Sequence, residues 1–208
     1  MRLFSGVPLL RFSIRAGLAG LLLSLAACAP LRTHGDPAGM AAQTDREHVL
    51  QSRPRWSLVG RIAVSNGEDG GNAQVEWMQV GESCDLRVTA PVTGKTWHLA
   101  ADQRQATLDG VGATRLTDRT AATLLEREVG WHIPVAQLQY WVRAMRSPES
   151  TAELVFDAQH VLTGLVQSGW TVEYRDYFVE GEPRLPRKVF ASRGKQRVRL
   201  YIERWQEE

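Results

Sequence analysis

The segment Gly94-Lys95-Thr96 has the residue types of the second half of a phosphate-binding loop. A complete loop also needs a glycine five residues before its second glycine, and Thr89 occupies that position. A complete phosphate-binding loop also leads into a helix whose N-terminus faces the phosphates. Here residues 96–99 alternate in the manner of a strand. The segment therefore predicts a turn rather than a nucleotide site.

Cys28 is the residue with the clearest covalent chemistry. Three arginines and an apolar run from Ala16 to Ala27 precede it, as in the charged start and apolar centre of a signal peptide. The run is short for a membrane span. It ends in Leu25-Ala26-Ala27-Cys28, which resembles the bacterial lipobox. We expect residues 1–27 to be a lipoprotein signal peptide and Cys28 to be lipidated. The alternative is an ordinary signal peptide with a chance cysteine.

Ala29 follows the cysteine. In lipoproteins an aspartate at that position usually means retention in the inner membrane, so Ala29 indicates release to the outer membrane. The protein would then be anchored through Cys28 and face the periplasm, where ATP is scarce.

Removal of residues 1–27 lowers the formal net charge from +2 to −1, because they carry three arginines and no acid. No global charge then favours nucleic acid as a partner. The rest of the 208-residue chain is long enough for one domain with a substantial core. Cys84 lies in a strand pattern and is expected to be a small buried residue, and with Cys28 lipidated the chain can form no internal disulfide.

The remaining side chains that could do chemistry form no recognisable site. Glu126 and Glu128 fit a solvated helix face better than an acid–base pair, and no G-x-S-x-G nucleophile elbow is present. No two histidines have the helical spacing of a metal site. We expect no catalytic residue, no metal and no cofactor. The histidines considered are His34, His48, His98, His132 and His160.

The elements that position these residues begin with a predicted flexible tether over residues 28–39, which is rich in Pro, Gly and Ala. A single domain is expected over residues 40–208. Its first element is a helix from near Met40 to Ser52, ended by Arg53-Pro54.

Alternation of period two then predicts an antiparallel sheet with one buried side. Trp77 and Trp97, for example, fall on inward-facing positions. The expected strands cover residues 56–64, 73–79, 84–90, 95–101 and about 105–108.

Two helices interrupt the strands. The first starts with Thr117 or Asp118 as its cap and stops at Gly130, and the second runs from Pro134 to Met145. Strands return over residues 153–157, 160–167, 170–179, 187–193 and 196–205. This order predicts an α+β fold, one large antiparallel sheet with helices on its concave side.

Several motifs match one known family. They are "WSLVGR" from Trp56, "VEW" from Val75, the "APVTG" hairpin, "GWHIPVAQLQYWVRAM" from Gly130 and "PRLPRKVF" from Pro183. With the lipobox, they make most of the mature chain resemble the LolB family of outer-membrane lipoprotein receptors. The resemblance implies an unclosed β-barrel of LolA/LolB-like type, with helices as a lid over an apolar cavity.

The resemblance also implies partners. Such proteins take a lipoprotein by its acyl chains from a soluble, LolA-like periplasmic carrier and pass it to outer-membrane lipid, and we expect a monomer. The alternative is a lipid-anchored structural or assembly protein with a filled core. Bound lipid would distinguish the two.

Three groups of residues are candidates for this function. Pro91 and Gly94 favour a hairpin tip, where the family places a protruding apolar residue that helps deliver cargo to the membrane; here it is Val92. An ordinary exposed valine is the alternative. Because the predicted helix pair should cover the cavity mouth, we expect its apolar residues to form the cavity wall. These are Trp131, Ile133, Leu138 and Trp141.

Two ambiguities stay open in the sequence. Large aromatic side chains are usually core, so Trp77, Trp97 and Trp170 fit either the core or the cavity wall. A run of basic residues near the C-terminus is expected on the outer face of strands. Alternatively, these residues bind an acidic carrier or anionic lipid. Its members are Arg184, Arg187, Lys188, Arg193, Lys195, Arg197 and Arg199.

Overall fold

The computed structural model describes residues 33–34 and 36–207. Cys28, the predicted signal peptide and most of the predicted tether lie outside these residues. The described residues belong to one compact unit, Leu31–Glu208. Among them, no helix is long and apolar enough to cross a membrane.

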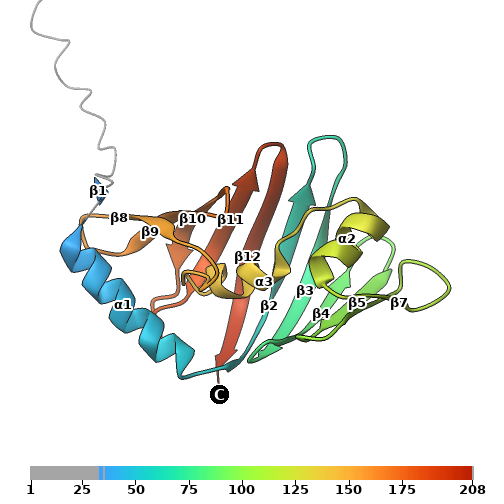
Figure 1. Ribbon diagram of the computed structural model, residues 1–208, viewed down its shortest axis with the longest axis horizontal. Helices are drawn as coiled ribbons and strands as arrows, with labels where there is room; N and C mark the ends of the chain where they lie inside the picture. The colour runs from blue at the N-terminus through green and yellow to red at the C-terminus, as the bar shows by residue number, and fades with distance from the viewer. Residues whose placement is uncertain (1–32, 35, 208) are drawn as a thin grey trace, which may run out of the picture. The chain divides into compact units, whose positions relative to one another are not determined.

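A single twelve-stranded antiparallel sheet dominates the fold, in the order β1-β8-β9-β10-β11-β12-β2-β3-β4-β5-β6-β7. β1 and β7 form its two edges and do not pair with each other within the described residues, so the barrel is unclosed. The sheet curves strongly, with helices on its concave side (Figure 1). The predicted fold class is therefore confirmed.

Two meanders of sequential strands make up the sheet, and the pairing of β2 with β12 joins them. The first contains β2 (Arg55–Ser65), β3 (Gly70–Val80), β4 (Ser83–Thr89), β5 (Thr96–Ala101), β6 (Ala106–Asp109) and β7 (Leu116–Asp118). The second contains β8 (Ala152–Phe156), β9 (Leu162–Gln167), β10 (Trp170–Tyr177), β11 (Pro186–Arg193) and β12 (Gln196–Glu207). The short β1 (Thr33–His34) pairs with β8.

Three helices complete the described chain: α1 (Pro37–Gln51), α2 (Ala121–Val129) and α3 (Val135–Trp141). Asp36 caps α1 by accepting a hydrogen bond from the Ala38 N–H at 3.1 Å. Thr120 caps α2 in the same way for the Thr123 N–H, and α2 stops at Gly130 as predicted. Alternate side chains of the strands point into one continuous apolar core, which α2 and α3 also contact.

Several boundaries differ from those predicted, and three of these differences concern the helices. α1 begins at Pro37, so its first turn and β1 occupy part of the segment expected as a tether. Thr117 and Asp118 do not cap α2, because both pair with β6 as part of β7. Because these two residues are paired in the sheet, the helix begins later, and Thr120 is its N-cap.

The third difference is the end of α3, which stops at Trp141 rather than at Met145. Ala144 takes a left-handed conformation, with φ of 55°. Side chains of α1 bind the carbonyls freed by this turn: Arg46 Nη2 donates to the Arg143 oxygen at 2.7 Å, and Gln43 Nε2 donates to the Ala144 oxygen at 2.8 Å. Arg46 and Gln43 of α1 thus satisfy carbonyls of the turn that follows α3.

Candidate functional site: an apolar cavity between the sheet and two helices

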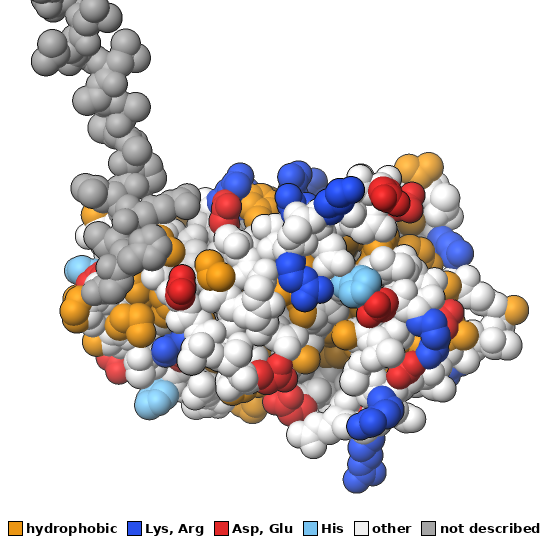
Figure 2. All heavy atoms as spheres, turned by 45° about the horizontal axis from the view of Figure 1, so that its top comes forward, with side chains coloured by type: hydrophobic (Ala, Val, Ile, Leu, Met, Phe, Trp, Pro, Cys, Tyr) orange, Lys and Arg blue, Asp and Glu red, His pale blue; other side chains and the backbone are white. Residues whose placement is uncertain are grey.

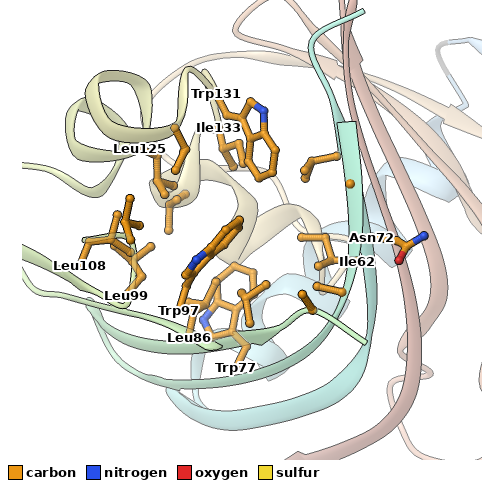
Figure 3. A pocket seen from close by; sticks show the side chains of 18 of the residues that line it. Ile62, Asn72, Trp77, Leu86, Trp97, Leu99, Leu108, Leu125, Trp131 and Ile133 are labelled. Carbon is orange, nitrogen blue, oxygen red and sulfur yellow. The ribbon is translucent and has the colours of Figure 1, made fainter. Parts of the chain in front are cut away.

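A cavity of about 230 Å³ lies between strands β2–β6 and the helices α2 and α3. Figure 3 shows side chains from the strands and from the helical segment converging on it. Its wall is almost entirely hydrocarbon and indole. The lining residues are Ile62, Val64, Gly71, Asn72, Ala73, Trp77, Leu86, Val88, Ala90, Lys95, Trp97, Leu99, Leu108, Val111, Leu125, Val129, Trp131, Ile133, Val135 and Leu138.

The strand register orders this wall from the hairpin tip inward. Val88 lies opposite Trp97, and one inward-facing step further along the same strands Leu86 lies opposite Leu99. On the other side of β4, Leu86 faces Trp77. Period-two alternation puts these residues on one face, and the curvature of the sheet brings them around the cavity.

Two indoles of the wall are held differently. The Trp77 Nε1–H donates to Gln79 Oε1 at 2.9 Å, and Gln79 Nε2 in turn donates to Gln139 Oε1 in the C-terminal half of α3. Trp97 instead meets Trp131 edge to face, with ring centroids 6.2 Å apart. The first contact ties the sheet to the lid helices, and the second closes the cavity by aromatic packing alone.

The polar residues of the wall, Asn72 and Lys95, are exposed next to the strand ends, and Lys95 belongs to the β4–β5 hairpin tip. The tip closes through hydrogen bonds between Ala90 and Lys95, at 2.9 Å, and between Gly94 and Ala90, at 3.0 Å. Gly94 has φ of +65°, a conformation that favours glycine. Val92 stands out from this tip with 95% of its surface exposed.

Of the four residues expected in the cavity wall, Trp131, Ile133 and Leu138 line it. Trp141 is the exception, because it is 0% exposed in the core behind α3. Its Nε1–H donates to Gln167 Oε1 at 2.8 Å, and its ring lies 6.2 Å from that of Trp170. The side chain is thus drawn toward β9 and β10, away from the cavity.

Most of the lining comes from strands, which the expectation based on the helix pair did not include. Trp77 and Trp97 could have been predicted as lining residues, because alternation in the sequence already places them on the inward face of their strands. Leu125 of α2 lines the cavity as well. No local signal marks Val111, which follows β6 in a loop.

The chemistry available here is apolar binding. Burial raises the pKa of the Cys84 thiol to about 11, which keeps it protonated and unreactive at neutral pH. Glu126 and Glu128 do not face each other; their carboxylates pair with His132 and Arg127. Within residues 33–34 and 36–207, no three His, Cys, Asp or Glu side chains converge as metal ligands.

The basic run lies mainly on the outer face and at the ends of the second meander. Several of its guanidinium groups cover aromatic rings: Arg187 lies over Phe178 at 4.6 Å, and Arg193 lies over Trp170 at 5.2 Å. Basic and acidic side chains are interspersed on the face shown in Figure 2. These contacts explain the basic residues as side chains that pack over aromatic rings at the protein surface.

Comparison with known proteins decides the family. The model of the family "Outer membrane lipoprotein LolB" matches residues 54–205. The chain belongs to the LolB family. An outer-membrane lipoprotein LolB of Xylella fastidiosa (strain Temecula1) is 34% identical over 83% of this chain and 80% of its own. One of Xanthomonas euvesicatoria is 33% identical over 90% of this chain and 94% of its own.

LolB membership confirms the resemblance seen in the sequence motifs and the expected role of an outer-membrane lipoprotein receptor, and it does not favour a scaffold with a filled core. A solved structure, a DUF1329 family protein from Desulfovibrio piger, has a TM-score of 0.50 and 5% identity over 82% of this chain and 92% of its own. That likeness concerns the fold alone.

Proposed function

We propose that this LolB-family chain takes a lipoprotein by its acyl chains from a soluble periplasmic carrier, holds them in the apolar cavity and inserts them into the outer membrane. The observation that supports this best is the cavity itself. It lies between the sheet and α2–α3, and its wall offers hydrocarbon and indole surfaces.

Apolar burial is sufficient to drive such a transfer. Each CH₂ group removed from water contributes about 0.8 kcal/mol, so a long acyl chain binds strongly without a specific polar contact. Movement from carrier to receptor to bilayer then requires only that each site bind the chain more tightly than the one before. No nucleotide hydrolysis is needed at this step.

The lid helices must move when a whole lipoprotein anchor enters. The cavity of about 230 Å³ is smaller than the ~300–1,000 Å³ usual for small-ligand sites. α2 is the element best suited to move, since only Ala121 and Leu124 of its nine residues are buried. The protein works as a monomer anchored through Cys28 at the periplasmic face, with the Pro91–Gly94 tip directed at the bilayer.

A charge placed inside the cavity tests the proposal. Leu125→Glu puts a carboxylate among the lining residues, whereas Ala122→Glu puts the same group on the exposed side of the same helix. Both are made in a soluble form that begins at Ala29. Because an ionised carboxylate is costly in apolar surroundings, Leu125→Glu should lower uptake of a fluorescent acyl probe and of lipoprotein from its carrier, and Ala122→Glu should leave both unchanged.

Circular dichroism and thermal melts confirm that the two variants fold. A folded Leu125→Glu protein with normal uptake would show that the cavity is not the cargo site. A wild-type protein that purifies without lipid and binds no acyl probe would favour a structural lipoprotein.

A further inference from the structure

Trp97 carries a hydrogen-bond donor that the protein does not use. Its Nε1 atom is buried and has no acceptor among the described residues. The other buried, unpaired side-chain atoms belong to Arg46, Arg143 and Ser147, none of which lines the cavity. Because Trp97 lines the cavity, its unsatisfied N–H group lies within the wall of an otherwise apolar binding site.

Other indoles of this chain show that such a donor is normally paired. Trp77 Nε1 donates to Gln79 at 2.9 Å, Trp141 Nε1 to Gln167 at 2.8 Å and Trp205 Nε1 to the Pro186 carbonyl at 2.9 Å. Buried polar groups in proteins almost always have a partner, and an unpaired one calls for an explanation. A missing ligand is such an explanation when the group lies on a cavity wall.

The cavity wall itself offers Trp97 no side-chain acceptor. Asn72 is the only lining residue with a side-chain oxygen. Figure 3 shows Asn72 at the margin of the cavity, apart from Trp97, which stands between Trp131 and Ile133 on one side and Trp77 on the other. No side-chain oxygen or nitrogen of the wall is therefore bonded to the Trp97 N–H, which leaves this donor for an acceptor that a ligand supplies.

We propose that the Trp97 Nε1–H donates a hydrogen bond to the carbonyl oxygen of the ester or amide that joins an acyl chain to the rest of the lipid ligand. This inference rests on the proposed function and adds a polar subsite to it. A carbonyl is the acceptor that every acyl group has, and it is uncharged, so an apolar wall tolerates it once the bond is made.

The place of Trp97 along its strand fits this assignment. Trp97 follows the hairpin tip, two residues after the exposed Lys95, and the next inward-facing residue of β5 is Leu99, about 7 Å deeper. A carbonyl at Trp97 leaves the polar end of the ligand near the tip. The hydrocarbon then continues toward Leu99, Leu86 and Leu138, which line the deeper part.

Nε1 is closed to water before the ligand enters, so the side chains around Trp97 must part for the bond to form. The edge-to-face contact between Trp97 and Trp131 is one such contact. Because the donor gives up no water in binding, the new hydrogen bond favours ligands with a carbonyl over those with hydrocarbon alone.

The test compares two ligands that differ in one carbonyl: 1-lauroyl glycerol, an ester, and 1-O-dodecyl glycerol, its ether analogue. Affinities are measured below the micelle concentration by displacement of a fluorescent acyl probe. The soluble form starting at Ala29 is suitable, because all described core residues lie in the compact unit 31–208. Trp97→Phe keeps an aromatic ring and removes only the N–H and the second ring.

We expect Trp97→Phe to lose about two- to tenfold in affinity for the ester relative to the ether, the usual effect of one neutral hydrogen bond. Trp131→Phe is the matched control: it makes the same change in the facing indole and should shift both affinities together. In ¹⁵N-labelled wild-type protein, the Trp97 indole N–H resonance should move downfield with the ester and much less with the ether.

Two outcomes overturn the inference while leaving the cavity function intact: equal losses for ester and ether in Trp97→Phe, or an indole resonance that the ester does not move. The first also results if the Trp131 ring already accepts this N–H. Failure of the wild type to bind either glycerol lipid would instead contradict the proposed function itself.

Discussion

Val92 and Val179 are the most exposed large apolar side chains of the described chain, at 95% and 88%. Their surroundings differ. Val92 lies on the β4–β5 tip, between the cavity residues Ala90 and Lys95. Val179 follows β10, and the strand register places it at the opposite end of the sheet. Of the two, only Val92 lies beside the cavity residues, so we propose that Val92 contacts the membrane that receives the ligand.

Val92→Glu should therefore slow delivery and leave uptake unchanged. Full burial of a valine contributes about 1.5 kcal/mol or slightly more, so its loss should slow insertion by about tenfold. The Pro91–Gly94 turn is unaffected, and the protein should fold normally. Uptake from the carrier and insertion into vesicles are followed separately with the soluble form, which excludes effects of anchoring.

Val179→Glu is the matched control, because it adds the same charge to an equally exposed valine away from the cavity. It should not change either rate. Equal insertion by the Val92 variant and the wild type would make the tip an ordinary turn. Loss of uptake in that variant would place Val92 in the carrier interface instead.

Cys84 should be nearly inert in the folded protein. Burial raises its pKa to about 11, above the ordinary thiol value of 9.0, so the reactive thiolate is scarce at pH 8 and increases only as the pH approaches 11. Reaction with a disulfide reagent at pH 8 should be slow in buffer and fast in urea. Fast labelling in buffer would show that the site opens.

At the level of elements, Gly60 explains part of the W-x-L-x-G-R motif. It lies on β2 opposite Ile202, beside the bulge in β12 where the register shifts between Ile202 and Arg204. A Cβ atom at residue 60 would come within 2.3 Å of the Tyr201 carbonyl oxygen. The two meanders approach so closely here that only glycine fits.

Gly60→Ala should accordingly destabilise the fold by about 1–3 kcal/mol, because the β2 and β12 backbones must separate. Gly71→Ala is the control: it lies on the neighbouring strand with no atom within 4 Å of its added Cβ. Urea unfolding of both variants checks the difference. Similar stability of the two would mean that the β2–β12 pairing adjusts without cost.

α1 is held to the segment that follows α3 by a buried carboxylate. Glu47 accepts hydrogen bonds from Arg146 Nη2 at 2.6 Å, from the Arg146 backbone N–H at 2.9 Å and from Gln43 at 2.9 Å. Glu47→Gln keeps the shape of the side chain but removes its charge. We expect the free energy of unfolding to fall by about 1–3 kcal/mol, less than for a fully buried ion pair, because Arg146 is partly exposed to solvent. Urea denaturation measures this change in the free energy of unfolding.

Glu203→Gln provides the comparison. Glu203 pairs with Arg61 at 3.0 Å on the surface, and pairs of this kind contribute about 0–1 kcal/mol. If the Glu47 change cost no more than the Glu203 change, the α1 contact would depend on its other residues, such as Leu50, Arg46 and Gln43.

The sequence predicts the elements well because their periods are local properties. Alternation from Ala73 to Gln79 in β3 and the stop at Gly130 need no knowledge of distant contacts. The end of α3 is different, because Arg46 and Gln43, about a hundred residues away, bind the carbonyls of the turn that follows it.

The candidate site shows the same division. The inward positions of Trp77 and Trp97 follow from alternation, but the separation of cavity wall from core does not. Leu138 and Trp141 share one face of α3, yet only Leu138 lines the cavity. Trp141 turns to Gln167, whose position depends on the packing of β9 against α3.

For the whole molecule, the anchor is the main prediction that lies outside the described residues. Cys28 should carry three acyl chains, because a single chain binds a bilayer only marginally and several chains together anchor firmly. Mass spectrometry of the mature N-terminus measures this. An unmodified N-terminus produced by cleavage elsewhere would contradict the lipoprotein assignment.

The β2–β12 pairing has a consequence for how the chain assembles. Apart from this pair and β1–β8, every pairing joins strands that follow each other in sequence, so each meander can form from local hairpins. Bringing β2 to β12 closes a loop of more than a hundred residues, which is entropically costly and slow. Until Gln196–Glu207 arrives, β2 keeps eleven residues of backbone without a partner on that side. A chain cut short before β12 would therefore offer other chains a long open strand, and aggregation rather than partial function is its expected fate.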